Sequence, residues 1–481
     1  MIEQSTLLRE YVTALRQNNA SIFIGSGMSR SVSGLNWKDL IMPYAKMIGY
    51  SQKDNDYPFI AQAYVNSGHD ISSFKKDICD KFKSPEIPEF HKLIARLPIK
   101  NYWTTNYDTL IENALDEAKK HKDVIFDNAS FCSLDDARDH LVYKCHGDCN
   151  HPQSIVITQQ DYESYRLKAF NFSNALYNEL ASSTILFLGY SFSDPDINNI
   201  LATLSTINDV KQTHYMITKK EKGSKAVKQA HWIKNLERYG IKTLLIGDYP
   251  YIMDIMSEIE KRYMANKIMI SGSANVYPSN LPEKEARQFI YDLGYQLVEF
   301  DCSRSNVGHG LKIINGNGLG VGPYLYEGIA EATATFDLDM AEYLTMYPFP
   351  KTYYSKFEKD KSLEEKYRKY REKMIDKCGI VFFMFGNRYD DNGNIVNAPG
   401  VRKEFEIAFQ KHKYIFPIGA TGFMAKELAD EVLENFEKYN GKMPNLKRAL
   451  MRLNSPKIKP RDIIDNILNI INTLAFAPEN K

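Results

Sequence analysis

The stretch ASIFIGSGMS, residues 20–29, joins a short apolar run to a turn containing two glycines. The run predicts a buried strand. Glycines between a strand and a helix let the backbone approach a pyrophosphate, which the free N–H groups of the helix N-terminus can bind. The dehydrogenase fingerprint G-x-G-x-x-G is not completed, because Arg30 stands where its third glycine would be. By itself, the turn fits a tight strand-to-helix connection and a nucleotide site equally well.

Similar apolar runs alternate with longer helical patterns along the chain, which is typical of parallel sheets crossed by helices. The alternation predicts an α/β protein with two doubly wound, Rossmann-like domains. The strands expected in the first domain are 20–24, 99–105, 140–145, 184–190, 214–218 and 241–246. Those expected in the second are 267–271, 311–316, 379–385 and 413–418.

The chain of 481 residues is too long for one domain of ordinary size. A charged helical stretch ends near 260–267 and a fresh apolar strand begins there, so we expect domains over 1–265 and 266–481. Residues 38–97 are far more than one crossover helix needs, and they predict a helical insertion over the first site.

Composition excludes several classes of protein. Lys and Arg number 61 against 60 Asp and Glu, so no overall field draws the chain to nucleic acid or to an anionic membrane. No apolar run approaches the ~18 residues of a membrane helix, and the start MIEQSTLLRE does not resemble a signal peptide. We therefore expect a cytoplasmic protein whose six cysteines are free thiols.

Polar side chains follow three more of the expected strands. The carboxyl ends of parallel strands meet at one edge of a sheet, where open α/β sheets bind ligands. An alternative role for Asn106 and Asp108 is helix capping. The residues at these ends are Thr105, Asn106 and Asp108, then His146 and Gly147, and then Gly189, Ser191 and Asp194.

The order of these motifs, GSGxS, TxNxD, a strand ending in HG, and GxSxxD, resembles the sirtuin family of NAD-consuming enzymes. The resemblance implies that His146 is the general base and that Asn106 and Asp108 lie near the reacting ribose and nicotinamide. It also implies an NAD site completed by Gly25, Ser26, Gly27 and Ser29 at the phosphates, together with Gly189, Ser191 and Asp194.

The stretch CHGDCNH, residues 145–151, has the composition of a metal site. Sirtuin deacylases carry two C-x-x-C pairs after their HG motif, whereas only Cys149 occurs between His146 and the strand at 184. Ligands crowded along one short extended stretch do not suit tetrahedral zinc. We therefore expect no metal and no cofactor beyond NAD as substrate, and we expect His146 to be the working residue of the stretch.

Cleavage of NAD at the nicotinamide–ribose bond expels a neutral leaving group, so the barrier is formation of an oxocarbenium-like ribose. A neutral histidine can accept a proton from water or a ribose hydroxyl. Without the deacylase zinc subdomain, water is the expected acceptor, and the products would be ADP-ribose and nicotinamide. The alternatives are a zinc-free deacylase or ADP-ribosyl transferase, and a non-catalytic nucleotide sensor.

The second half carries glycine-rich turns of its own. IMISGSA includes Gly272 and Ser273, and INGNGLGVG includes Gly318 and Gly320 ahead of a helix, a pattern that can bind anions or pack closely on a sheet. With FGNR and PGVRKEFEIA, these features resemble the SLOG group of nucleotide-binding domains. The related phosphoribohydrolases carry PGGxGTxxE. The stretch beginning at Pro399 lacks the GxGT turn, so binding is expected rather than catalysis.

A sirtuin-like domain followed by a SLOG domain resembles the effectors of the Thoeris anti-phage system over nearly the whole chain. The resemblance implies an NADase switched on by a cyclic ADP-ribose isomer that a TIR-domain partner makes, so that NAD is depleted. It also implies a homo-oligomer, a tetramer or a larger assembly. The residues that would meet this ligand are Gly272, Ser273, Gly318, Gly320, Arg371, Arg388 and Glu404.

Overall fold

The structure is a computed structural model that describes residues 2–34, 37–50, 56–82, 86–168, 170–192, 194–207, 212–304, 310–349 and 361–476. The chain forms two compact units, Met1–Glu260 and Lys261–Lys481. Each unit is built on its own parallel sheet, which confirms the α/β fold with two doubly wound domains.

Unit 1 contains a seven-stranded parallel sheet in the order β3-β4-β2-β1-β5-β6-β7. Its central strand β1 is buried at every position because helices cover both faces, and such strands read as continuous apolar runs. The strands are β1 (Ala20–Ile24), β2 (Asn101–Thr104), β3 (Lys122–Ile125), β4 (His140–Lys144), β5 (Thr184–Leu188), β6 (His214–Lys219) and β7 (Ile241–Ile246). The edge strand β3 is the one strand of this sheet that the sequence patterns did not predict.

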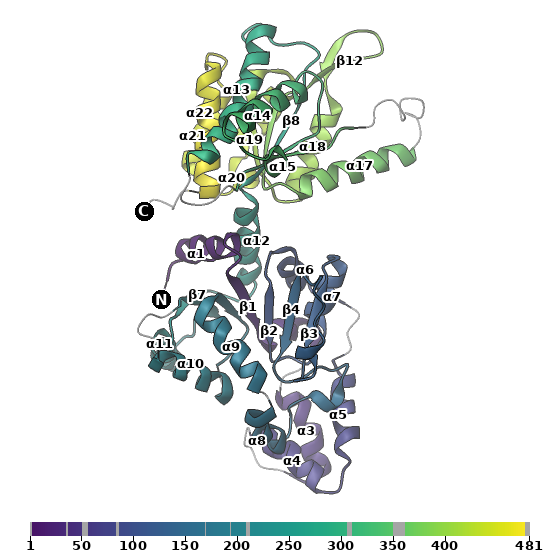
Figure 1. The fold of residues 1–481 in the computed structure, drawn as a ribbon, viewed down its shortest axis with the longest axis vertical. Coiled ribbons are helices and arrows are strands. Elements are labelled where there is room, and N and C mark those ends of the chain that lie inside the picture. The colour runs from purple at the N-terminus through teal and green to yellow at the C-terminus, as the bar shows by residue number, and fades with distance from the viewer. Residues whose placement is uncertain are drawn as a thin grey trace. The chain divides into compact units, whose positions relative to one another are not determined.

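The helices of unit 1 connect these strands and cover the sheet (Figure 1). Helix α2 follows β1 directly, and α7 follows the loop after β2. The bounds are α1 (Gln4–Arg16), α2 (Ser26–Ser33), α7 (Leu110–Glu117), α9 (Phe170–Ser182), α10 (Pro195–Ile207), α11 (Ser224–Glu237) and α12 (Tyr251–Met264).

The helical stretch expected over 38–97 divides into two parts. Helices α3 (Trp37–Met47), α4 (Tyr57–Asn66) and α5 (Ile71–Asp80) gather with α8 (Gln159–Lys168) beyond one end of the sheet (Figure 1). Their own small core includes Ile41, Tyr44, Ile60 and Phe74, and α5 packs on the 3-10 helix Pro152–Ser154 that follows β4. Helix α6 (Glu89–Arg96) instead packs on α7.

Unit 2 contains a five-stranded parallel sheet in the order β10-β9-β8-β11-β14. Four strands match the sequence patterns, whereas β10 and a small antiparallel hairpin, β12–β13, were not predicted. The strands are β8 (Lys267–Ser273), β9 (Lys312–Asn315), β10 (Leu344–Met346), β11 (Ile380–Phe385), β12 (Asn387–Tyr389), β13 (Ile395–Asn397) and β14 (Tyr414–Pro417).

Helix α13 packs along α14 and also contacts α22, so these helices form one layer beside the sheet of unit 2 (Figure 1). Helices α17 and α18 pack on each other. The bounds are α13 (Glu283–Cys302), α14 (Gly322–Thr335), α15 (Met340–Tyr343), α17 (Lys361–Asp376), α18 (Pro399–Gln410), α19 (Phe423–Glu434), α20 (Phe436–Asn440), α21 (Pro444–Leu453) and α22 (Pro460–Ile471). Among the described residues, no helix has the length and apolarity needed to cross a membrane.

Candidate functional site

The four strands whose ends carry the sequence motifs are neighbours in the sheet of unit 1, in the order β4-β2-β1-β5. The chain runs from β1 to β2 on one side and later returns to β5 on the other side of β1. Such a reversal of strand order opens a crevice at the carboxyl ends of the strands, which is where doubly wound folds bind ligands. The topology therefore gathers the predicted residues at one edge.

The glycine turn lies against the end of β5. The N–H of Gly25 donates to the carbonyl of Leu188 at 2.9 Å, and that of Gly27 donates to the carbonyl of Gly189 at 3.2 Å. A Cβ atom at Gly25 would lie 2.3 Å from the Gly189 carbonyl oxygen, so only glycine fits this close approach. Helix α2 begins at Ser26, which is exposed, and the N–H of Met28 in its first turn donates to the Gly25 carbonyl at 3.1 Å. The positive end of this helix therefore lies at the carboxyl end of β1, where doubly wound folds bind anions.

Asn106 is held beside this turn. Its Nδ2 donates to Ser29 Oγ at 3.1 Å, and its own N–H donates to Thr104 Oγ1 at 2.9 Å. The Thr104 hydroxyl in turn donates to the Ile24 carbonyl at 2.7 Å, which joins the ends of β2 and β1. Ser29 is buried, so its hydroxyl holds the Asn106 side chain in place.

Asp108 is buried at the start of α7. Its Oδ1 accepts the N–H of Leu110, the first residue of that helix, at 3.2 Å. The capping role that the sequence left open therefore applies to Asp108, whereas Asn106 bonds to Ser29 and Thr104.

His146 lies just beyond β4, and its Nε2 is 2.8 Å from Asp194 Oδ2. Both side chains are buried, with 7% and 8% of their surfaces exposed. Tyr162 and Tyr165 meet the imidazole edge-on, with ring centroids 5.6 and 5.5 Å away. Strands β2 and β1 separate β4 from β5, so this contact brings two loops together across their ends.

Of the remaining predicted residues, Gly189 has a φ of +64° and packs on the glycine turn, whereas Ser191 is exposed. The structure thus brings together Gly25, Gly27 and Gly189, joins Ser29 to Asn106, and pairs His146 with Asp194. The sequence had assigned Asp194 to NAD alone, and its partnership with His146 was missed because nothing in a single sequence links positions 146 and 194.

The cysteines beside His146 are buried thiols. Burial raises the pKa of Cys149 to about 11 and raises that of Cys145 further, which disfavours the thiolate that a metal ligand needs. Across the described ranges, His, Cys, Asp and Glu side chains form no group of three or more that could hold a metal ion.

A cavity of about 760 Å³ lies beside Tyr165, and Cys145, Phe126 and Phe172 help to line it. Its described lining comes from the segments after β3 and β4 and from α8 and α9. The glycine turn does not contribute to it. We therefore do not take this cavity as the NAD site.

In unit 2 the two predicted glycine turns interlock. A Cβ atom at Gly318 would lie 1.9 Å from the Gly272 carbonyl oxygen, so the turn after β9 packs on the end of β8. The N–H of Ala274 donates to the carbonyl of Leu319 at 2.7 Å, and Gly320 turns with a φ of +69°. Ser273 Oγ donates to the Asn387 carbonyl at 3.2 Å.

Arg371 on α17 and Glu404 on α18 meet beside β8. Arg371 Nε lies 3.6 Å from Glu404 Oε1, beyond hydrogen-bond length, and among the described residues this buried Nε has no hydrogen-bond partner. Ser271 Oγ donates to Glu404 Oε2 at 2.6 Å. Burial raises the pKa of Glu404, and Ser271 and Arg371 offset part of that rise. The Arg371 guanidinium also lies over the Phe349 ring, 5.0 Å from its centroid.

Arg388 lies on β12 and is exposed. Its neighbour Asn387, which the sequence analysis passed over, is buried and fixes the loop after β8. Asn387 Oδ1 accepts the N–H groups of Asn275 and Val276 at 2.9 and 3.1 Å, and its Nδ2 donates to the Val276 carbonyl at 2.9 Å. In the sequence, the asparagine within the FGNR motif was the feature that could have indicated this role.

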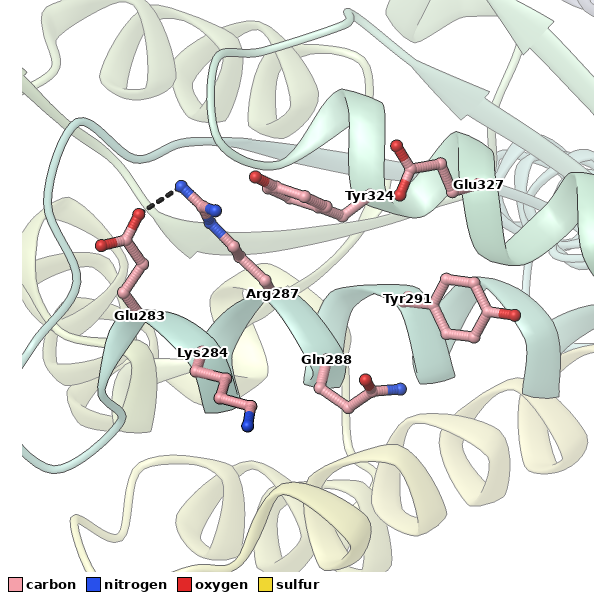
Figure 2. Close-up of a pocket in the computed structure, with 7 residues that line it drawn as sticks. All are labelled: Glu283, Lys284, Arg287, Gln288, Tyr291, Tyr324 and Glu327. Atoms are coloured by element: carbon pink, nitrogen blue, oxygen red, sulfur yellow. Dashed lines mark hydrogen bonds and ion pairs between the residues drawn. The ribbon is translucent and has the colours of Figure 1, made fainter.

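A second depression, of about 630 Å³, lies between α13 and α14 (Figure 2). Arg287 forms an ion pair with Glu283 there, and its guanidinium lies 5.2 Å from the centroid of the Tyr324 ring. None of the seven residues that line it is a predicted ligand residue, and it is an open surface feature. We do not assign the effector to it.

Comparisons with known proteins agree with this two-domain arrangement. Residues 100–244 match the family model described as SIR2-like domain, and residues 251–474 match the Sir2- and TIR-associating SLOG family. The chain is 35% identical to NAD(+) hydrolase ThsA of Bacillus cereus (strain MSX-D12), over 97% of this chain and 98% of that protein. It is 34% identical to NAD(+) hydrolase ThsA of Cytobacillus dafuensis, over 98% and 97%.

Defense-associated sirtuin 2 of Bacillus subtilis shares 28% identity over 40% of this chain and 20% of its own length. This match covers only part of each chain, and the name of this relative is the one that mentions defence. The full-length matches, at more than 30% identity and with both domains in the same order, decide the assignment: the chain belongs to the ThsA family of NAD(+) hydrolases.

Proposed function

We propose that unit 1 hydrolyses NAD⁺ to ADP-ribose, nicotinamide and a proton at the crevice above β1 and β2. The observation that carries this site is the convergence of the glycine turn, Asn106 and His146 at neighbouring strand ends. The glycine turn and the positive N-terminal end of α2 would hold the pyrophosphate. Holding the ribose in place and stabilising its developing positive charge would then lower the barrier.

His146 is the proposed general base. In the neutral imidazole one nitrogen carries the proton, and a donor at Nε2 suits the Asp194 carboxylate 2.8 Å away. Nδ1 is then the nitrogen that accepts a proton from water or a ribose hydroxyl. Asn106 would orient that water through its amide, after exchanging its bond with Ser29 for one to the substrate.

The experiment is to replace Asn106 and His146 separately by alanine and to follow release of nicotinamide from NAD⁺ by the full-length chain. Each variant should lose at least 99% of the activity, on the order of the 10²–10⁴-fold contribution of a positioned acid or base. An acetylated peptide added to the wild type should not change the products. Normal turnover by either variant would remove it from the site, and peptide-dependent turnover would favour a deacylase.

We further propose that unit 2 is the sensor and that the enzyme acts in anti-phage defence by depleting NAD. The name of its family model, with the association to TIR domains that it states, supports a signal derived from a TIR-domain protein. A cyclic ADP-ribose isomer is the ligand we propose. The largely buried Arg371 guanidinium, which faces the Glu404 carboxylate at 3.6 Å and lies over an aromatic ring, suits phosphate and ribose hydroxyls.

The interlocked turns at Gly272, Ser273, Gly318 and Gly320 would face the same ligand, with Arg388 at its exposed rim. We propose that the protein acts in the cytoplasm as a homo-oligomer, a tetramer or a larger assembly, and that it needs no zinc.

A further inference from the structure

Lys144 is the last residue of β4 and has no exposed surface. A buried ammonium ion is costly unless it is paired and fully hydrogen-bonded. Here Lys144 Nζ lies 2.9 Å from Glu112 Oε1 on α7 and 2.8 Å from Asp148 Oδ2. Burial alone would lower the pKa of Lys144, but the two carboxylates outweigh it and raise that pKa above its ordinary value. The two carboxylate contacts therefore favour the charged form of the buried lysine.

The same ammonium group also holds the backbone beside Asn106. Lys144 Nζ donates to the Tyr107 carbonyl at 3.1 Å and to the carbonyl of Asp108. The Tyr107 carbonyl accepts a second bond, at 3.0 Å, from the N–H of Cys149. One buried cation thus joins the loop after β2 to the loop after β4.

His146 lies within the second of these loops, between Lys144 and Asp148. Asp148 is fixed on its other side, because its Oδ1 accepts the N–H of Asn150 at 2.6 Å and its own N–H donates to Ser154 Oγ at 2.9 Å. We propose that Lys144 is a positioning residue, which sets the distance between Asn106 and His146 by anchoring both of their loops to one charge. This inference rests on the site assigned under the proposed function.

A role of Lys144 in stability alone and a role in positioning the two loops predict different effects on activity. Replacing one member of a buried charge network leaves the others unpaired and destabilises the fold, whereas replacing all of them by neutral residues of similar size is often tolerated. If Lys144 only stabilises, restoring stability should restore activity. If it positions the two loops, stability can return without activity, because a misplacement of about 1 Å can cost ~100-fold in rate.

The test compares the full-length wild type with Lys144→Met and with the triple variant Glu112→Gln, Lys144→Met, Asp148→Asn. Unfolding temperature, kcat and KM for NAD⁺ cleavage are measured with and without a panel of cyclic ADP-ribose isomers. Lys120→Met is the matched control. Lys120 is a partly buried lysine of the same unit that donates to the Leu97 carbonyl at 2.8 Å, before β2 begins and so at the strand end opposite the site.

We expect Lys144→Met to unfold at a lower temperature and the triple variant to regain most of that loss. Both should keep kcat at least tenfold below wild type. Their KM should change less, because the glycine turn that would hold the pyrophosphate is untouched. Lys120→Met should keep the wild-type kcat.

A wild-type kcat in the triple variant, or in a folded Lys144→Met, overturns the positioning role while leaving the catalytic assignment intact if Asn106→Ala and His146→Ala are inactive. Normal turnover by those two alanine variants instead overturns the site itself, and the role of Lys144 with it.

Discussion

At the scale of single residues, the site depends on contacts that join side chains far apart in the chain. His146 and Asp194 belong to loops after strands that are not adjacent in the sheet, yet their side chains meet at 2.8 Å with little exposure to water. A carboxylate bound to one imidazole nitrogen fixes the ring and its tautomer, which makes the other nitrogen the proton acceptor. If His146 is the base, as we propose, Asp194 governs the orientation and tautomer of its ring.

Asp194→Asn should keep the size of the side chain but remove its charge. An amide can donate to the imidazole as well as accept from it, so the ring is free to take the wrong tautomer. We expect kcat to fall by about 10²-fold with a smaller change in KM, as measured by nicotinamide release. Asp248→Asn, at an exposed ion pair with Lys219, is the control and should match the wild type. Unchanged kcat in Asp194→Asn would show that Asp194 does not orient the base.

The sequence predicts a site residue only when a local pattern marks its position. Asn106, His146 and the glycine turn stand at the ends of apolar runs, and sheet topology alone brings such positions together. Lys144 and Asn387 could not be predicted as organising residues, because their partners are backbone groups of other loops. A buried lysine in a strand looks like any charged residue until the chain has folded around it.

At the scale of elements, strands covered on both faces were predicted well. The positions of β1, β5 and β11 are buried throughout, and their apolar runs are continuous. The unpredicted strands β3 and β10 lie at sheet edges, are short, and carry partly exposed residues, so they have no such run. The described residues of 38–97 form helices α3 to α6, and their split into a separate cluster and a crossover helix depends on packing that the sequence pattern does not show.

Strand β6 begins with a buried histidine that makes unit 1 sensitive to acid. Burial lowers the pKa of His214 to about 4, and its Nδ1 accepts the N–H of Ile185 at 3.3 Å. Between pH ~6.5 and about 4 the unfolded chain binds this proton and the folded chain does not, so stability falls as the pH falls. The loss amounts to roughly 3 kcal/mol once the pH reaches the folded pKa.

Chemical denaturation of the full-length wild type and of His214→Gln at several pH values checks this. The variant cannot take up the proton, so its unfolding free energy should change less than that of the wild type between pH 7 and about 4. His91 also has a pKa lowered by burial to about 4, and it will leave a residual slope in both proteins. Parallel pH dependences for the two proteins would mean that His214 does not contribute.

At the scale of the whole molecule, the chain carries two proposed phosphate sites on separate sheets, and a paired histidine and carboxylate lies beside the first of them. A ligand of unit 2 can activate unit 1 only if it binds the active state more tightly than the resting state, because equal affinity for both shifts nothing. A rise from 1% to 99% active requires a preference of about 10⁴-fold. Such a preference needs strong contacts, and the buried Arg371 donor is the one we propose for a phosphate.

Arg371→Ala should therefore abolish activation while leaving the catalytic groups in place. Cyclic ADP-ribose isomers are titrated against the full-length variant, with binding followed by calorimetry and NAD⁺ consumption followed in parallel. Arg402→Ala is the control, since Arg402 lies on α18 in ion pairs with Glu406 and Glu431 and should keep both responses.

We expect Arg371→Ala to lose binding and activation together, because removing a charge-assisted contact lowers the affinity of the state that the ligand must favour. Binding retained without activation would mean that Arg371 transmits the signal and does not receive it. Full activation of Arg371→Ala would place the effector elsewhere on the chain. Without Arg371, which faces the Glu404 carboxylate at 3.6 Å, that carboxylate would be left unpaired and would repel an anionic ligand bound beside it.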